Sequence, residues 1–180
     1  MANPDGSFTL TQSTTPERVK QHDGSWGSVD TALERDRTGG SPRSAVVDLS
    51  FSGGGAGSDM IHLSKSGRSV TLGWSGSLPA PAIDGSTATY PNVFDGVDLQ
   101  LTATAEGYRE ILVVKTSEAA QNPALEQVKL TASGDGLSLV AGAGGGLRAV
   151  DGDGNAVFHG PRDRCGTRPV TRRQAPRPRR

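Results

Sequence analysis

The chain has 180 residues, enough for one domain with a hydrophobic core or for one domain plus a tail. Only 33% of the residues are hydrophobic and 25 are glycine, which excludes a helical bundle because each interior glycine costs a helix about 1 kcal/mol. Residues 161–180 hold eight Arg and one Asp, a charge of +7, and the whole chain has a net charge of zero, so residues 1–160 carry −7. This acidic charge argues against a nucleic-acid-binding face on residues 1–160, because such a face needs clustered Lys and Arg.

The N-terminal part is expected to form short strands. An alternating run begins at Phe8, and His22-Asp23-Gly24-Ser25 predicts a hairpin turn between a strand around Val19 and one that begins at Trp26. Trp26 is expected to anchor the core. The polar segment Glu34 to Arg43, which contains Gly39-Gly40 and Pro42, is predicted to be a surface loop.

The next segment predicts further hairpins. Apolar residues alternate with polar ones in three runs, in which the apolar residues are Val47, Leu49 and Phe51; Ile61 and Leu63; and Val70, Leu72 and Trp74. Ser66-Gly67 is expected to turn the second run into the third, and Asp84-Gly85 to turn the chain into Thr87 to Tyr90. Trp74 is a predicted core residue.

The segment from Tyr90 to Val114 carries the clearest pattern in the chain. From Val97 to Ala105 apolar and polar residues alternate, and Glu106-Gly107 then turns the chain into a second apolar run that contains Tyr108, a third predicted core aromatic. This pattern predicts a long antiparallel hairpin with one buried face.

The remaining sequence predicts one helical turn and several strands. Ser117 to Gln127 is the one plausible helical segment, and Pro123 keeps it short. Four strands are expected around Val128 and Leu130, Leu137 to Val140, Leu147 to Val150, and Val157-Phe158. The fold class is therefore predicted to be all-β, an antiparallel β-sandwich of about a dozen short strands, in one module over residues 1–160.

A compact motif precedes the central hairpin, formed by Tyr90, Asn92, Val93, Gly96, Val97, Asp98 and Leu99. Pro91 fixes its own φ, Asn92 can close an Asx turn, and Gly96 permits a positive φ, so the chain is expected to bend sharply. Asp98 is expected to serve as a turn or edge hydrogen-bonding residue; the alternative is a ligand or metal contact.

Several stretches resemble one kind of known module, namely NPDGSFTL near the start, DGSWGSVDTAL, FSGGG and ATYPNVFDGVDLQLTATAEGYREILVVKTSEAAQNPAL. They are similar to the N-terminal β-domain of large secreted actinobacterial proteins that carry LamG-like jelly-roll, DNRLRE or RHS-type repeats further on. The resemblance covers about residues 3–160. It implies an extracellular or cell-envelope setting and a non-catalytic structural or interaction module, with downstream domains of the same polypeptide or envelope components as partners and with no cofactor.

The basic segment 161–180 departs from that resemblance, which implies Met-Trp-Asp-Ser followed by an Ala/Pro/Ser-rich linker. Permitted codons for Arg164 to Arg173 can be chosen so that a shifted frame encodes Met-Trp-Asp-Ser-Thr-Gly-Asp-Thr. We therefore expect a disordered Arg/Pro tail that results from a frameshift between about Phe158 and Arg164. The alternative is a functional basic tail for nucleic acid or anionic membranes.

Export and redox signals are sparse. The start MANPDGSFTL has no basic region followed by an apolar stretch, so it is not a signal peptide, and the resemblance implies that Met1 is a late start. No apolar run reaches the roughly 18 residues that a membrane span needs. Cys165 is the only cysteine, so no internal disulfide is possible.

Candidate chemistry is weak throughout. Asp151, Asp153 and Asn155 resemble the opening of a calcium loop, but Ala156 and Arg162 stand where Gly and Glu are needed, so a plain turn is the simpler interpretation. The Ser58 and His62 nucleophile pair lacks the required motif, and the histidines His22, His62 and His159 lack a spacing suited to zinc. Glu106 and Glu110 could mimic a glycosidase pair, but exposed acidic residues at a hairpin are commonplace.

Carbohydrate binding is the second functional hypothesis. It requires exposed aromatic side chains as stacking platforms. Trp26, Trp74, Tyr90 and Tyr108 are the available candidates, and at least three of them are expected to fill the core.

Overall fold

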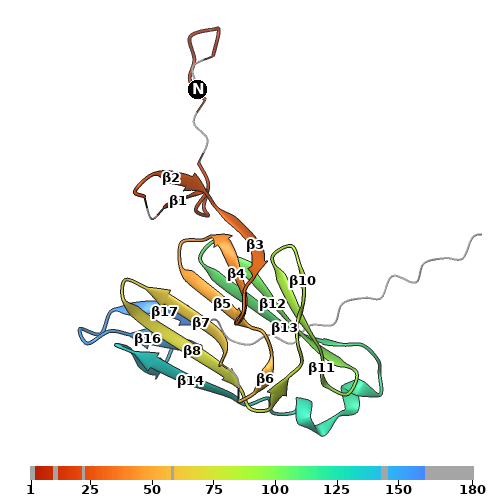
Figure 1. The fold of residues 1–180 in the computed structure, drawn as a ribbon. Coiled ribbons are helices and arrows are strands. Elements are labelled where there is room, and N and C mark those ends of the chain that lie inside the picture. Colours follow the sequence, from red (N-terminus) through yellow and green to blue (C-terminus); the bar gives the residue numbers. More distant parts are fainter. Residues whose placement is uncertain (1–2, 10–11, 22, 58, 143–145, 161–180) are drawn as a thin grey trace, which may run out of the picture.

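The computed structural model describes residues 3–9, 12–21, 23–57, 59–142 and 146–160. These residues form seventeen β-strands and two 3₁₀ turns, with every strand pair antiparallel and without any α-helix in the described segments. The predicted all-β antiparallel sandwich is confirmed (Figure 1). The strands outnumber the predicted dozen because several are only two or three residues long. In place of one helical turn there are two 3₁₀ turns, η1 (Ala119–Gln121) and η2 (Pro123–Leu125).

A six-stranded sheet forms one layer of the sandwich, in the order β14-β8-β7-β5-β4-β3. Its strands are β3 (Asp30–Arg35), β4 (Gly39–Ser44), β5 (Asp48–Ser52), β7 (Asp59–Lys65), β8 (Arg68–Trp74) and β14 (Leu130–Asp135). The predicted turn joins β7 to β8, with positive φ at Ser66 and Gly67 and with Leu63 paired to Val70.

The predicted surface loop from Glu34 to Arg43 is wrong, because these residues form the β3–β4 hairpin. Gly39 and Gly40 are buried where β4 meets β5. A Cβ atom at Gly39 would collide with the backbone carbonyl of Phe51, so this position accepts only glycine. The glycine pair therefore permits a close backbone approach, whereas from the sequence it indicated a surface loop.

A four-stranded sheet covers part of the inner face of the first sheet, in the order β10-β11-β12-β13. Its strands are β10 (Ala82–Asp84), β11 (Thr87–Phe94), β12 (Val97–Thr104) and β13 (Gly107–Val114). The predicted central hairpin is confirmed, with Val97 paired to Val114 and Thr104 paired to Gly107. The backbone N–H of Leu33 donates to the carbonyl of Gly85 at 2.8 Å, so β3 and the β10–β11 turn close one side of the sandwich.

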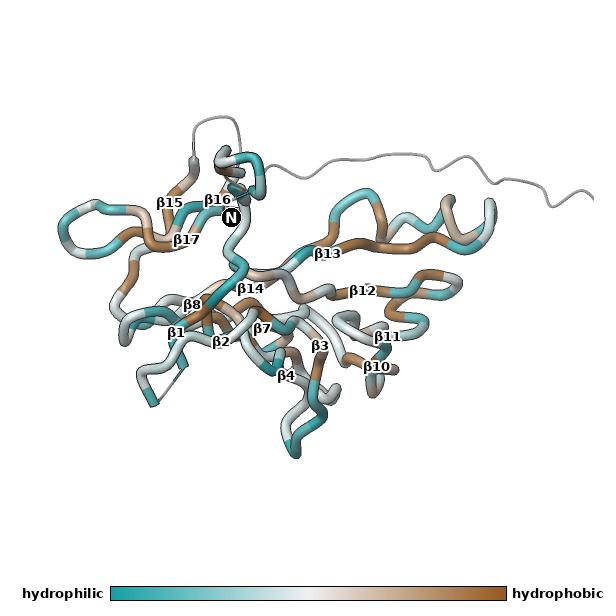
Figure 2. Tube along the Cα trace, turned by 90° about the horizontal axis from the view of Figure 1, so that it is seen from above, coloured by the Kyte–Doolittle hydropathy of each residue, from teal (hydrophilic) through white to brown (hydrophobic). Residues whose placement is uncertain are grey.

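A three-stranded sheet, β15-β16-β17, lies on the same side of the six-stranded sheet as the four-stranded sheet does (Figure 2). Its strands are β15 (Ser138–Ala141), β16 (Leu147–Val150) and β17 (Ala156–Gly160). Leu139, Ala149 and Phe158 contribute its apolar face to the core. An ion pair of 3.5 Å between Arg68 and Asp151 joins it to the start of β8.

A short two-stranded ladder and a small hairpin complete the fold. The β6 (Gly55–Ala56) and β9 (Ser77–Leu78) strands pair with each other, and β1 (Arg18–Lys20) pairs with β2 (Trp26–Ser28). The β1–β2 hairpin and the residues before it project from the sandwich as an N-terminal arm, which comprises the described residues of 3–28 (Figure 1). The predicted tail, 161–180, lies outside the described residues.

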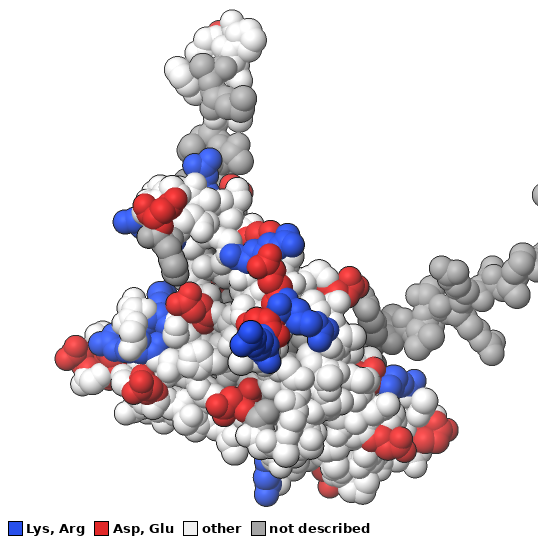
Figure 3. Space-filling model, viewed as in Figure 1, with Lys and Arg blue, Asp and Glu red and all other residues white. Residues whose placement is uncertain are grey.

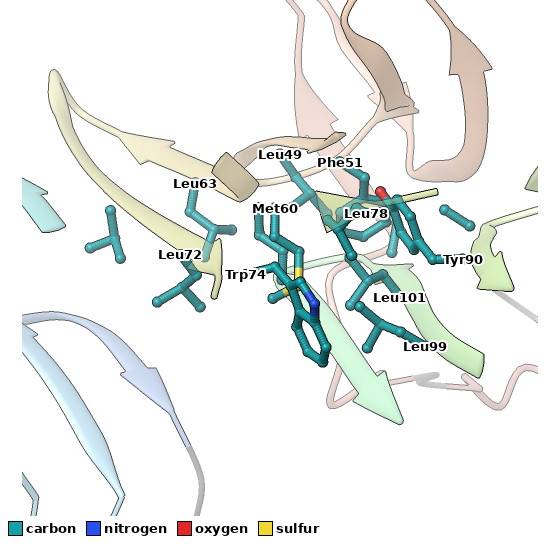
Figure 4. Packing of buried hydrophobic residues seen from close by; sticks show 14 of the residues in the cluster. Leu49, Phe51, Met60, Leu63, Leu72, Trp74, Leu78, Tyr90, Leu99 and Leu101 are labelled. Atoms are coloured by element: carbon teal, nitrogen blue, oxygen red, sulfur yellow. The ribbon is translucent and has the colours of Figure 1, made fainter. Parts of the chain in front are cut away.

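One hydrophobic core lies between the sheets, where side chains from both layers meet (Figure 4). The largest fully buried side chains are those of Phe51, Met60, Ile61, Tyr90, Val97, Leu99 and Leu101. Among the described residues, no helix has the length and apolar character required to cross a membrane.

Candidate functional site

Tyr90, the first residue of the sequence motif, joins the two main sheets. Its side chain is fully buried, and its hydroxyl donates a hydrogen bond of 2.6 Å to the backbone carbonyl of Ser52 at the end of β5. Burial raises the pKa of the phenol well above its ordinary value. Tyr90 is therefore a buried structural clamp and not an exposed stacking platform.

The chain bends after Tyr90, as the motif predicts, but the turn chemistry differs. The pairing of β11 with β12 is interrupted between Tyr90 and Phe94, and Gly96 has the predicted positive φ, +69°. Asn92 also has a positive φ, +52°. Its side-chain oxygen accepts a hydrogen bond from the Lys115 ammonium. Among the described residues it accepts none from the backbone N–H of Phe94, which an Asx turn requires, so the predicted Asx turn is wrong. Asn tolerates this backbone region better than most residues.

Asp98 is the centre of a polar cluster that we call the bulge cluster, formed by Asn92, Asp98 and Lys115. Asp98 Oδ1 accepts the backbone N–H of Asn92 at 2.8 Å and the Lys115 ammonium at 2.7 Å, and Asn92 Oδ1 accepts the same ammonium at 2.8 Å. The hydrogen bond from Lys115 and that from Asn92 lower the pKa of the Asp98 carboxyl. The carboxylate stays ionised and holds the bulge, the stretch between Tyr90 and Phe94 where the pairing of β11 with β12 is interrupted. This is the hydrogen-bonding role expected from the sequence.

The predicted core aromatics divide into three cases. Trp74 is buried and packs against Phe94 with ring centroids 5.6 Å apart, and Tyr108 is half-buried and meets Phe51 edge-on at 6.5 Å. The prediction that Trp26 anchors the core is wrong, because 64% of its surface is exposed.

The register of the β1–β2 hairpin explains this position of Trp26. Trp26 is paired with Lys20, and both side chains are exposed. The half-buried residues of the hairpin are the alternate pair Val19 and Gly27. Trp26 is therefore an exposed aromatic on the N-terminal arm.

An open cleft of about 360 Å³ lies between this hairpin and strands β4 and β5. Its lining is polar and apolar in about equal parts: the polar residues are Lys20, Gln21, Ser41, Arg43, Ser44, Asp48, Ser50 and His62, and the apolar ones are Val19, Pro42, Ala45, Val47 and Leu49. Gln21 donates to the Ser44 hydroxyl at 3.1 Å across the cleft. Arg43 is engaged by Glu34 at 2.9 Å and Asp30 at 3.5 Å, and charges of both signs are interspersed over this face (Figure 3). The cleft offers hydrogen bonds, not a strong field of one sign.

The calcium candidate forms the turn between β16 and β17. Asp151 Oδ1 accepts the backbone N–H groups of Asp153 at 3.1 Å and Asn155 at 2.9 Å, while its other oxygen faces Arg68. The hydrogen bond from Asn155 is the main cause of the lowered pKa of Asp151. Within the described residues, no three His, Cys, Asp or Glu side chains are grouped as a metal site would require. The simpler interpretation as a turn accounts for this segment.

The catalytic candidates occupy separate places. His62 lies on β7 with Nδ1 3.1 Å from the Thr71 hydroxyl, and His159 lies on β17. Glu106 is exposed in the turn that precedes β13, and Glu110 is half-buried within β13. Ser58 and His22 lie outside the described residues, as does Cys165.

Strand β13 presents the feature that the sequence analysis missed. Within the described residues it pairs only with β12, so it is an edge strand. Ile111 is 44% exposed and Val114 is 39% exposed. The signal was available, since Ile111-Leu112-Val113-Val114 is apolar without alternation, a pattern typical of a strand that is covered on both faces.

Comparison with known proteins identifies no relative: no family model, curated protein or solved structure matches the chain.

Proposed function

We propose that the chain is a non-enzymatic interaction module from the N-terminal part of a modular secreted or cell-surface protein. The observation that carries this proposal is the edge strand β13, which exposes large apolar side chains and pairs with only one strand among the described residues. Exposed apolar surface of this kind marks sites of protein contact.

The roles of the polar motif residues support the same function. Asp98, Asn92 and Asp151 bind backbone N–H groups or the cations of Lys115 and Arg68, and so they hold the turns of the sandwich. Their hydrogen-bonding capacity serves the scaffold, which leaves the edges and the arm as the surfaces for partners. The exported setting rests on the resemblance of residues 3–160 to secreted actinobacterial modules.

A specific observation favours carbohydrate binding as a second candidate. Trp26 is an exposed indole on the hairpin that borders the cleft. An exposed indole can stack on a sugar ring, while the hydroxyl, amide and carboxylate groups of the cleft can bind sugar hydroxyls. Trp74, by contrast, is buried and is not available for this role.

Co-sedimentation of the full chain with an actinobacterial envelope fraction tests both candidates. We expect the unmodified chain to pellet, the variant with both Ile111→Lys and Val114→Lys to lose about tenfold in bound fraction, and the surface control Lys129→Ala to behave as the unmodified chain does. Pelleting with purified polysaccharide that Trp26→Ala abolishes would establish the second candidate instead.

Absence of pelleting, together with turnover of ester or glycoside substrates, would overturn the proposed function. Circular dichroism of each variant shows whether a loss of binding reflects unfolding.

A further inference from the structure

The backbone of β13 is prepared to pair with another strand. The N–H of Lys115 donates to the carbonyl of Gly96 at 2.9 Å, and the register from Val97–Val114 to Thr104–Gly107 has no bulge. Backbone groups alternate in direction along a strand, so those of Leu112 and Val114 point away from β12. These groups form an edge onto which one more strand can add.

The side chains of β13 define what that strand must carry. The outer face of the sheet bears Arg109, Ile111 and Val113, because these residues are paired with the polar residues Thr102, Gln100 and Asp98 of β12. A neighbouring strand would place its alternate side chains beside these three. Two apolar residues fit next to Ile111 and Val113.

The charges add a second requirement. Lys115 is already engaged by Asp98 and Asn92. Arg109 is exposed, and its guanidinium has no hydrogen-bond or ion-pair partner among the described residues. An acidic side chain directly across from Arg109 on the added strand would pair with it.

Neither a second copy nor the basic segment of this chain meets these requirements. In antiparallel pairing of two β13 strands, the outer face would bring together only Gly107, Arg109, Ile111, Val113 and Lys115, none of which is acidic. Residues 161–180 contain eight Arg and four Pro, and proline removes the donors that a ladder needs.

We propose that β13 binds an extended segment of another protein as a fifth strand of the four-stranded sheet, and that this segment carries an acidic residue and two apolar residues at alternate positions. This inference rests on the proposed function and names the partner chemistry of the same edge.

The test uses the full chain and the blocked peptide Thr-Val-Ile-Thr-Val-Thr-Glu, which places Glu across from Arg109 in antiparallel pairing. We expect saturable binding in isothermal titration calorimetry. A peptide N-methylated at the Val and Thr that face Val114 and Leu112 keeps every side chain but lacks the ladder donors, and should bind at least about tenfold more weakly. Equal binding of the N-methylated peptide would overturn strand addition.

A charge exchange tests the acidic requirement. A second peptide has Lys in place of the terminal Glu. Arg109→Glu should weaken binding of the Glu peptide about fivefold and strengthen binding of the Lys peptide. The surface control Arg37→Glu should change the affinity for neither peptide. Unchanged preference in Arg109→Glu would overturn the acidic requirement.

Light scattering tests whether a second copy of the chain occupies the edge of β13. Concentration-dependent dimers that Ile111→Lys dissolves would overturn the proposed occupant in favour of a second copy. Co-sedimentation in which envelope binding survives Ile111→Lys and Arg109→Glu would retain the interaction module and overturn strand addition. If the unmodified chain binds neither the peptide nor the envelope fraction, the proposed function and strand addition are both overturned.

Discussion

Strands β12 and β13 belong to one hairpin and have the same length, yet their environments differ. Val97, Leu99 and Leu101 of β12 are fully buried and alternate with half-buried polar residues. In β13 the apolar residues are consecutive, and none is fully buried. The difference comes from position in the sheet, because β12 has a neighbour on each side and β13 has only one among the described strands.

The comparison teaches that the same apolar residue type has two uses in this sheet. In β12 apolar side chains stabilise the fold by filling the core, and in β13 Leu112 packs against that core while Ile111 and Val114 are left exposed for a partner to cover.

Leu99→Ala should lower the free energy of unfolding by about 3 kcal/mol, because it leaves a cavity in the centre of the core. Ile111→Ala, in the register position opposite Gln100, should cost less than about 1 kcal/mol because its side chain is already exposed. Urea denaturation of the two variants measures the difference. Equal losses would show that β13 is covered as well as β12 is.

Gly96→Ala should cost about 2 kcal/mol, since Gly96 precedes β12 with a φ of +69° and an added Cβ would lie 2.7 Å from the Cβ of Ala119. Gly107→Ala is the matched control at the start of β13, where an added Cβ meets nothing within 4 Å. It should change stability by less than about 0.5 kcal/mol. Thermal denaturation in which both variants melt alike would contradict the tight packing of η1 against the β11–β12 turn at Gly96.

Tyr90→Phe should cost about 1 kcal/mol, because it removes the hydrogen bond to Ser52 and leaves a carbonyl without that donor, while the ring still fills the core. Chemical denaturation checks this value. A stability equal to that of the unmodified chain would mean that water replaces the hydroxyl at the sheet junction.

Asp98→Asn should cost less than about 1 kcal/mol at pH 7, and the cost should depend on pH. The pKa of Asp98 is lowered in the folded chain below its ordinary value of 3.8, so its stabilisation is present above that value and is lost as the pH falls through the folded-state pKa. Melting temperatures of both proteins should therefore converge between pH 5 and the acid limit. A difference in melting temperature that persists in strong acid would show that the bonds of Asp98 to Lys115 and Asn92 are not the source of the stabilisation.

Trp26→Ala should leave stability unchanged within about 0.5 kcal/mol, because the indole is exposed on the arm. The chain has two tryptophans, so fluorescence can separate them. Iodide should quench the emission of Trp26 and leave that of the buried Trp74. Protection of both indoles from iodide would place Trp26 in a contact.

Much of the candidate site follows from local sequence. The bend after Tyr90, the positive φ of Gly96 and the hydrogen-bonding role of Asp98 are local consequences of a turn that precedes an alternating strand. The partner of Asn92 is not local, since Lys115 reaches it from the end of β13. No spacing rule could have joined these residues.

The sequence by itself determined the fold class and most hairpins, because alternation of apolar residues and Gly- or Asp-containing turns act over a few neighbouring residues. Only the tertiary structure decided which glycines are packed, which tryptophan is buried and which strand lies at an edge. Gly39 is explained by the approach of β5, Trp26 by the projection of its hairpin, and β13 by the order of strands in its sheet. Each depends on contacts between residues distant in the chain, which local pattern does not encode.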